Sequence, residues 1–344
     1  MASNSGCLTH INLAAGLRGG ERQTLLLIEQ LAERGWRQRL VTRPNAPLAR
    51  ALPESLQGTV DVRTGANVVA AARACTASAI VHAHDGRAVY AAALAGWYYR
   101  AQTVLTRRVM NPLRRGWAQR LAYGRAHAVV AISTAVAEAI TTSLPFVKPV
   151  IIPSAYQPPQ PPTGYADTLR QQWGERFVVG NVAALEDDSK GQSCLVALAR
   201  AVPDVHVVLV GSGRDEAPLR AAASGLTNVE FAGQSDDVDA YLRAFDLFAF
   251  PSLREGFGSV LLDAMRHGLA VVAKKTGGIV DIVESGKTGY LVAANDNDGF
   301  IAAVQDLQHD AVRRREFGAA AQQRVERFSA AIMADRYEAL YRAM

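Results

Sequence analysis

Short apolar runs alternate along the chain with longer segments in which apolar residues recur every three or four positions. The first pattern is typical of buried strands and the second of helices that pack on one side. Because the two patterns take turns over almost the whole chain, we expect parallel sheets wrapped by helices. The predicted strands are 8–11, 39–42, 79–82, 103–106, 128–132, 149–152, 177–181, 206–211, 229–231, 247–250, 270–273 and 289–292. The predicted helices include 23–32, 193–201, 217–224, 238–245 and a long last one over 320–344.

A proline-rich stretch divides the two series of strands. Residues 153–162 contain five prolines, which fix φ and lack a backbone N–H, so this stretch is neither helix nor inner strand. A chain of 344 residues is long enough for two cores. We therefore predict an α/β protein of two doubly wound, Rossmann-like domains facing each other across a cleft, with ligands beyond the carboxyl ends of the strands. The predicted parts are 1–152, a linker 153–165, a domain 166–325 and a helix 326–344 that packs back on the first domain.

Composition points to a cytoplasmic chain. No apolar run reaches the roughly 20 residues of a membrane-spanning helix, and the first residues lack the pattern of a signal peptide. Three scattered cysteines indicate neither a disulfide framework nor a metal cluster. The charge is uneven: residues 1–150 hold 18 Lys and Arg against 7 Asp and Glu, a net of +11, while the rest holds 19 against 25, a net of −6. The first half is thus expected to meet something anionic.

The segment 251–265 carries the clearest chemistry. It follows an apolar strand and leads into an apolar-periodic helix, so it reads as strand, glycine-containing loop and helix. Free N–H groups at a helix start form an anion site. Two acids flank this start, Glu255 in the loop and Asp263 one turn into the helix. Acids on both sides of a phosphate make sense if they bind hydroxyl groups, as in a nucleotide-sugar.

Four further loops after strands contain residues suited to a nucleotide diphosphate. Gly19 and Gly20 lie in the first glycine-rich loop, which does not fit the G-x-G-x-x-G dinucleotide pattern. Lys190 closes a loop of the second half, where it is placed as a point charge on phosphate. Gly211 begins the third loop, and the fourth contains Gly233 and Gln234. Each loop alone has a structural explanation, so their order along the chain matters more than any one of them.

That order resembles the retaining glycosyltransferases of the GT-B fold, in particular the bacterial group with a Glu-x₇-Glu signature that builds lipopolysaccharide and other envelope polysaccharides. The resemblance covers nearly the whole chain and is most specific over 246–292. It implies that Glu255 and Lys190 act in catalysis. To these we add His84 as a catalytic candidate, because it lies at a predicted strand end facing the cleft. The resemblance also implies a donor-binding set of Gly19, Gly20, Lys190, Gly211, Gly233, Gln234, Glu255, Gly256, Phe257, Gly258, Ser259, Val260 and Asp263.

The chain departs from the family pattern at several positions. Asp263 stands where the second glutamate is usual, and Ala184 stands where an arginine precedes the lysine. Asp281 replaces a glutamate, and Thr106 lies where many relatives have a histidine. Half of the cationic clamp on the diphosphate is therefore missing, unless Arg214 or Arg18 supplies it.

The first half contains two candidate groups for the acceptor. His82 and His84 lie two residues apart on a strand and so point to the same side, as metal ligands would. No third ligand is evident, so we expect no metal and no cofactor, and assign His82, His84, Arg107 and Arg108 to the acceptor, with burial in the core as the competing interpretation. Two Asp-x-Asp matches, 237–239 and 296–298, are interpreted as structural.

Aromatic residues and arginines interleave over residues 97–125. The stretch contains Trp97, Tyr98, Tyr99, Arg100, Arg107, Arg108, Arg114, Arg115, Trp117, Arg120 and Arg125. Such a stretch suits an anionic membrane surface or acceptor phosphates, and solvated helices are the simpler interpretation. We expect no nucleic acid partner, because no nucleic-acid-binding fold is indicated.

The sequence therefore predicts a retaining glycosyltransferase that uses a nucleotide-sugar, with a UDP-sugar favoured, and a glycan or glycolipid acceptor. The protein is expected in the cytoplasm, as a peripheral protein on the inner face of the cytoplasmic membrane. Two other functions stay open. One is a nucleotide-sugar epimerase, which needs no acceptor, and the other is a non-catalytic nucleotide- or carbohydrate-binding protein, suggested by Ala184 and Asp263.

Overall fold

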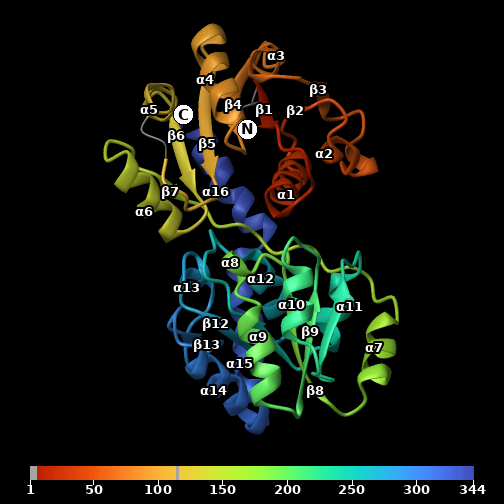
Figure 1. Ribbon diagram of the computed structural model, residues 1–344. Helices are drawn as coiled ribbons and strands as arrows, with labels where there is room; N and C mark the ends of the chain where they lie inside the picture. The colour runs from red at the N-terminus through yellow and green to blue at the C-terminus, as the bar shows by residue number, and fades with distance from the viewer. Residues whose placement is uncertain (1–5, 114–115) are drawn as a thin grey trace. The chain divides into compact units, whose positions relative to one another are not determined.

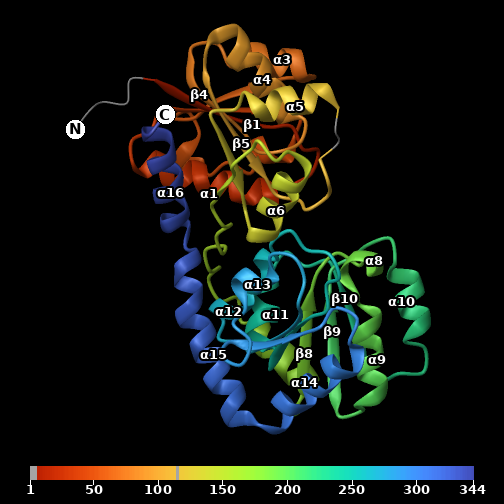
Figure 2. The same cartoon turned by 90° about the vertical axis from the view of Figure 1, so that its left-hand side faces the viewer.

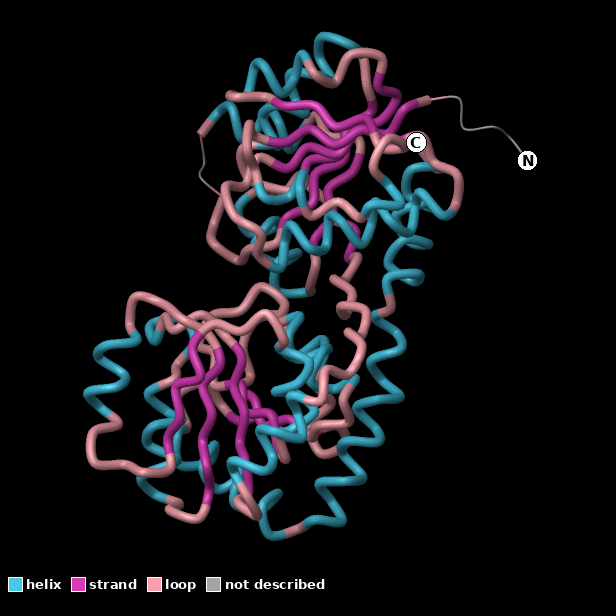
Figure 3. Tube along the Cα trace, turned by 90° about the vertical axis from the view of Figure 1, so that its right-hand side faces the viewer, coloured by secondary structure: helices cyan, strands magenta, loops and turns pink. Residues whose placement is uncertain are grey.

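The computed structural model describes residues 6–113 and 116–344. Arg114 and Arg115, which belong to the predicted aromatic and arginine stretch 97–125, lie outside the described residues. The chain divides into two compact units (Figures 1 and 3). Unit 1 runs to Ala155 and also includes Ser329–Met344, whereas unit 2 comprises Tyr156–Phe328. The observed boundary thus lies within the proline-rich segment that the sequence predicts as a linker.

Unit 1 is built on a parallel sheet of seven strands in the order β3-β2-β1-β4-β5-β6-β7. The strands are β1 (Cys7–Asn12), β2 (Gln38–Thr42), β3 (Asp61–Thr64), β4 (Ser78–Ala83), β5 (Gln102–Arg107), β6 (Ala128–Ala131) and β7 (Val150–Ile151). His10 of β1 is paired in register with His82 of β4. This register brings polar side chains of two neighbouring central strands together.

Helices cover both faces of this sheet. Those of unit 1 are α1 (Gly19–Glu33), α2 (Pro47–Arg50), α3 (Val68–Arg73), α4 (Ala88–Tyr99), α5 (Trp117–Gly124), α6 (Thr134–Ser143) and α16 (Ala330–Arg342), with a 3₁₀ turn η1 (Glu54–Leu56). Helices α1 and α16 pack together on one face, and on the other face α4 packs beside both α3 and α5 (Figure 2). The α16 side chains Met333, Tyr337 and Tyr341 join a buried core with Leu8, Leu27 and Val104, among others.

Unit 2 repeats this architecture with a parallel sheet of six strands in the order β10-β9-β8-β11-β12-β13. The strands are β8 (Phe177–Val182), β9 (Val205–Val210), β10 (Val229–Gly233), β11 (Leu247–Phe250), β12 (Val271–Lys274) and β13 (Gly289–Val292). The two parallel, helix-wrapped sheets that the sequence predicts are confirmed.

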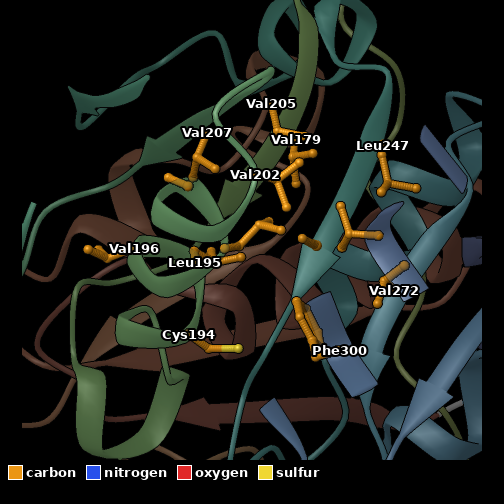
Figure 4. Close-up of a cluster of buried hydrophobic side chains, with 14 of the residues drawn as sticks. Val179, Cys194, Leu195, Val196, Val202, Val205, Val207, Leu247, Val272 and Phe300 are labelled. Atoms are coloured by element: carbon orange, nitrogen blue, oxygen red, sulfur yellow. The ribbon is translucent and has the colours of Figure 1, made fainter. Parts of the chain in front are cut away.

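The helices of unit 2 pack an apolar core against this sheet. They are α7 (Tyr165–Trp173), α8 (Asp187–Lys190), α9 (Ser193–Ala201), α10 (Glu216–Ala222), α11 (Val238–Ala244), α12 (Ser259–Arg266), α13 (Ile279–Ile282), α14 (Asn297–His309) and α15 (Ala311–Val325), with a 3₁₀ turn η2 (Glu326–Phe328). Figure 4 shows Leu195 of α9, Val179 of β8 and Phe300 of α14 in one buried cluster. This core fixes the central strands, whose carboxyl ends carry the loops described below.

Two sequence predictions need correction here. The single helix predicted over 320–344 is wrong, because α15 ends at Val325, η2 follows, and α16 begins anew with Ser329 as its N-cap. The Ser329 side chain accepts the N–H of Ile332 at 3.3 Å, which starts a new helix. The edge strand β3 was not predicted, since its four residues are all exposed and mostly polar.

Candidate functional site

Four neighbouring strand ends of unit 2 bring together most of the predicted donor residues. Because β10, β9, β8 and β11 are adjacent and parallel, the loops after them lie along one edge of the sheet. The Gly211 N–H donates to the Gly233 carbonyl at 2.7 Å, and the Leu185 N–H donates to the Ser212 carbonyl at 3.1 Å. Gly211 has a φ of +137°, and a Cβ there would lie 2.0 Å from the Ala183 oxygen. The first three of these loops are therefore packed backbone against backbone.

The loop after β8 also packs against the loop after β11. The backbone N–H groups of Leu253 and Arg254 donate to the Ser189 carbonyl at 2.9 and 3.1 Å. Gly191 ends α8 with a φ of +67°, and a Cβ there would lie 2.4 Å from the Pro251 oxygen. Only glycine combines this left-handed backbone with so close an approach. The position of Lys190 relative to Glu255 is set by these contacts.

Lys190 and Glu255 form an ion pair at the centre of this edge. Lys190 Nζ lies 2.6 Å from Glu255 Oε2, and the side chains are 23% and 16% exposed. The Glu255 carbonyl also accepts the N–H of Gly278 at 3.1 Å, which anchors the loop from its other side. The predicted catalytic acid and the predicted phosphate-binding lysine are therefore direct neighbours, partly shielded from water.

Helix α12 begins immediately after this loop. Gly258 is its N-cap with a φ of +89°, and among the residues that the structure describes no side chain caps the first turn. Such N–H groups, with the helix dipole, form an anion site. The Phe257 side chain is buried, and its ring centroid lies 5.9 Å from that of Phe328. This side chain therefore packs into unit 2 and does not face a ligand. Any donor contact at Phe257 would have to come from the backbone.

Asp263 lies one turn further along α12. Its Oδ1 accepts the backbone N–H of Gln157 at 2.9 Å, so one oxygen of this carboxylate binds the proline-rich segment, two residues after unit 1 ends at Ala155. Gln234, in contrast, is an exposed side chain after β10, next to Gly233 with its φ of +73°. The structure thus brings Lys190, Glu255 and the start of α12 into one cluster, with Asp263 one turn behind.

A second group of charges adjoins the same two loops. Asp188 accepts hydrogen bonds from Arg214 at 2.5 Å and from Arg254 at 3.1 Å, and all three side chains are more than half exposed. These two arginines lower the pKa of the Asp188 carboxyl below its usual value, the hydrogen bond from Arg214 contributing most. Ala184 carries no charge, and its carbonyl accepts from Gln192 at 2.7 Å. Sequence reasoning named Arg214 but missed Arg254, although its position beside Glu255 was a usable signal.

In unit 1, His82 and His84 form a buried network with His10. The His84 Nε2 and His10 Nδ1 atoms are 2.9 Å apart, and His10 Nε2 lies 3.0 Å from Gln38 Oε1. His82 Nδ1 lies 2.6 Å from the Tyr341 hydroxyl and His82 Nε2 2.7 Å from that of Thr106. Tyr341 belongs to α16, so the network ties the C-terminal helix to β4. Sequence reasoning missed both His10 and Tyr341.

The hydrogen bonds assign the tautomers of two of these rings. The Gln38 amide nitrogen donates to the Ile28 carbonyl at 2.9 Å, so its oxygen accepts from His10 Nε2–H. His10 Nδ1 then accepts from His84 Nε2–H, and His84 Nδ1 is left with a buried lone pair that has no partner among the described residues. Burial lowers the pKa of His10 to about 4 and, as the first cause, the pKa values of His82 and His84 well below normal.

This network also supplies the third imidazole that the sequence did not reveal. One ring nitrogen from each of His10, His82 and His84 lies within 4.8 Å of the other two. Three histidine nitrogens are the protein ligands of some catalytic zinc sites. Five of the six ring nitrogens are engaged with one another, with Gln38 or with the two hydroxyl groups. His84 Nδ1 has no such partner among the described residues. The three histidines form a buried, hydrogen-bonded cluster in unit 1.

The remaining predicted residues of unit 1 lie at the ends of β5 and the start of α1. Gly19 and Gly20 open α1, and a Cβ on Gly20 would lie 3.3 Å from Arg108 Cδ. Arg108 Nη1 donates to the Ser154 hydroxyl at 3.4 Å, and Arg107 bonds the carbonyl of Asn111. The roles predicted for these glycines and arginines stay predictions.

Comparison with known proteins assigns the class. Residues 17–157 match the family described as "Glycosyltransferase Family 4", and residues 176–310 match the family described as "Glycosyl transferases group 1". The alpha-maltose-1-phosphate synthase of Mycolicibacterium smegmatis is 31% identical over 309 residues, covering 77% of this chain and 79% of that protein. The phosphatidyl-myo-inositol mannosyltransferase of the same organism is 34% identical over 164 residues, covering 45% of this chain and 42% of the relative.

A solved structure agrees in fold over the full chain. Anabaena HepE in complex with UDP and glucose has a TM-score of 0.85, with 21% identity, covering 98% of this chain and 100% of that one. The protein is therefore a glycosyltransferase with two Rossmann-like sheets of the GT-B type. It belongs to the glycosyl transferases group 1 family. No helix in the described part of the chain is long and apolar enough to cross a membrane.

Proposed function

We propose that the protein is a retaining glycosyltransferase that moves a sugar from a nucleotide-sugar, a UDP-sugar in the first instance, to a glycan or lipid-linked acceptor. The observation that carries this proposal is the Lys190–Glu255 pair, 2.6 Å apart, on the loop that leads into the uncapped start of α12. A cation, a row of backbone N–H groups and an acid are then available within one loop cluster. This is the chemistry that a sugar diphosphate requires.

In this proposal each group has one task. Lys190 and the N–H groups of Ser259 and Val260 take up the charge that develops on the leaving diphosphate, the electrostatic contribution that usually dominates such catalysis. Glu255, with the backbone of Gly256 and Phe257, holds the sugar. Asp263 binds the ribose diol, and the turns at Gly211 and Gly233 frame the base.

The missing cation at Ala184 has a replacement within unit 2. Arg214 and Arg254 both reach Asp188, two positions before Lys190, from the loops after β9 and β11. We propose that they supply the second positive charge of the clamp. If so, replacing both arginines by glutamine will weaken binding of UDP, whereas Arg220→Gln, an exposed arginine on α10, will not.

Retention requires the acceptor hydroxyl to attack on the face that the leaving group departs from. We propose that the leaving phosphate itself accepts the proton of the acceptor hydroxyl, so that the step needs no separate general base. Lys190 and the N–H groups of α12 take up the charge of the diphosphate, and we propose no metal for this task. His84 is the catalytic candidate of unit 1, with His82, Arg107 and Arg108 on the acceptor. The buried lone pair on His84 Nδ1 supports a role in accepting a hydrogen bond.

The acceptor is proposed to belong to envelope polysaccharide or lipopolysaccharide assembly, at the cytoplasmic face of the inner membrane. One support is the net charge of +11 in residues 1–150. Another is the relative whose name states a phosphatidyl-myo-inositol acceptor. Both favour an acceptor that carries negative charge.

Two measurements separate this function from its competitors. Thermal shift against UDP-, GDP- and dTDP-sugars is expected to show stabilisation by one nucleotide series, which names the donor. Product analysis with donor alone is expected to show no isomerised sugar, since transfer needs an acceptor. Isomerisation without acceptor would favour an epimerase. No stabilisation by any series would favour the non-catalytic protein suggested by Ala184 and Asp263.

A further inference from the structure

The charge of unit 1 is concentrated in one stretch. Between Asp85 and Glu138 the sequence contains eight arginines and neither aspartate nor glutamate. A solvated helical surface normally mixes both signs of charge, which keeps the local field small. Helices α4 and α5 of this stretch lie on the face of the sheet opposite α16 (Figure 2). Arg87 and Arg100 flank α4, and Arg120 and Arg125 lie on and after α5.

Helix α4 presents an apolar face to solvent. Its alanines, among them Ala91 and Ala95, are buried against the sheet. Four larger side chains of α4 lie on one side of the helix, because they are spaced by four, three and one residues: Tyr90, Leu94, Trp97 and Tyr98. All four are exposed, Trp97 and Tyr98 at 73% each. No residue of α4 carries a charge, so this outer side is not an ordinary polar helix face.

Helix α5 extends this face. It packs beside α4, and it exposes Trp117 at 79% and Leu121 at 45%. The guanidinium of Arg120 lies over the ring of Phe146, 5.3 Å from its centroid. We use the name α4–α5 face for Tyr90, Leu94, Trp97, Tyr98, Trp117 and Leu121. Arginines surround it: Arg87 and Arg100 at the two ends of α4, and Arg120 and Arg125 on and after α5, all exposed.

We propose that the α4–α5 face binds the surface of an anionic lipid bilayer. Tryptophan and tyrosine combine an apolar body with a polar tip, and this suits them to the depth of lipid headgroups. Leu94 and Leu121 add apolar contact there, and the surrounding arginines meet the negative headgroups without a repelling acid nearby. A nucleic acid would use the arginines and aromatic rings but would leave both leucines without a role.

This inference goes beyond the proposed reaction and depends on unit 1 alone. The transferase proposal depends on Lys190, Glu255 and α12 of unit 2. The two can therefore fail separately. A protein that binds UDP but no vesicle would contradict only the membrane inference, and one that binds vesicles but no nucleotide-sugar would contradict only the transferase.

The test is flotation of the full chain with vesicles. One set contains phosphatidylcholine alone, and the other contains phosphatidylcholine and phosphatidylglycerol in equal amounts. The chain is expected to float with the anionic set at low salt, to be released at high salt, and to ignore the neutral set. Trp97→Ser with Trp117→Ser, and separately Arg120→Glu with Arg125→Glu, are each expected to lower the bound fraction at least tenfold.

Matched controls use exposed residues of unit 2. Val312→Ser replaces an apolar residue that is 58% exposed, and Arg220→Glu reverses an exposed arginine, and both are expected to float as the parent does. Because all the changed residues are exposed, thermal unfolding should be unaltered, and it is recorded for each variant. Failure to float with anionic vesicles overturns the inference. So does flotation that the four substitutions leave intact, or stronger binding of a single-stranded oligonucleotide than of vesicles through the same residues.

Discussion

Lys190 Nζ lies 2.6 Å from Glu255 Oε2, and the two residues stand on loops that follow the neighbouring strands β8 and β11. Sixty-five residues separate them in sequence, yet the hydrogen bonds from Leu253 and Arg254 to Ser189 leave these loops little freedom. The pair is mostly shielded from water, so it is stronger than an exposed ion pair of the same length. The predictions below follow from this relationship.

Replacing Glu255 by glutamine removes the negative charge and keeps the shape. We expect turnover to fall by about 10²-fold or more, because an interaction made at the reacting sugar is lost. Binding of UDP, which lacks the sugar, should stay within a few-fold of the parent. The control is Glu33→Gln, an exposed acid at the end of α1. Turnover near the parent value in Glu255→Gln would refute the role of this acid.

Replacing Lys190 by methionine tests the contact with phosphate. The variant should bind UDP about 10-fold or more weakly, since a charge-assisted hydrogen bond contributes roughly 1.5–3 kcal/mol. Uridine, which has no phosphate, should bind the variant and the parent equally. Lys287→Met is the control, because Lys287 is an exposed lysine of unit 2 that pairs only locally with Glu284. Equal losses for UDP and uridine would mean that Lys190 does not bind the diphosphate.

Replacing Gly191 by alanine tests the packing of the two loops. A left-handed backbone costs an alanine about 1–2 kcal/mol, and the clash with the Pro251 oxygen adds about 1–3 kcal/mol. Gly286→Ala is matched to it: Gly286 has a φ of +78° with nothing within 4 Å of its Cβ, so only the backbone cost applies. Urea unfolding should show Gly191→Ala as clearly the less stable variant. If the two lose equal stability, the close approach of the loops is wrong.

Acid should destabilise unit 1 through its buried histidines. Burial holds the pKa of His10 at about 4, while an imidazole in the unfolded chain titrates near 6.5. Between pH about 6.5 and about 4 the unfolded chain therefore binds more protons at His10 than the folded chain does. The stability that neutral His10 contributes is fully present above pH about 6.5 and is lost as the pH falls toward 4. At pH 5 the loss from His10 alone is about 2 kcal/mol.

The measurement is urea unfolding at several pH values between 7.5 and 4.5, followed by circular dichroism. His10→Gln should be less stable than the parent at neutral pH but should show a weaker dependence on pH. The matched control is His309→Gln, which replaces an exposed histidine in the last turn of α14. An unchanged slope in His10→Gln would show that His10 is not the titrating group.

The features that sequence reasoning predicted best are those encoded over a few neighbouring residues. The strand at 247–250 and the loop and helix after it follow from an apolar run, a glycine-containing turn and 3.6-residue spacing, and the structure has β11 and α12 there. Lys190 and Glu255 each stood out in a loop after a strand. Their direct pairing did not, because nothing in sequence fixes how two loops pack.

The features that were missed depend on distant residues. His10 and His82 face each other because of the register of β1 against β4, and Tyr341 reaches His82 from 259 residues away. Trp97 and Tyr98 stood out in the sequence, but it was not evident that Tyr90 and Leu94 join them on one exposed apolar side of α4. A helix of alanines and aromatic residues looks uniformly apolar until the structure shows which side the sheet covers.

The most direct test of the account is the crystal structure of the protein with a bound UDP-sugar. The account predicts the diphosphate within hydrogen-bonding distance of Lys190 Nζ and of the N–H groups that open α12, with the sugar toward Glu255 and the ribose toward Asp263. Nucleotide density at another edge of unit 2, away from these groups, would contradict it.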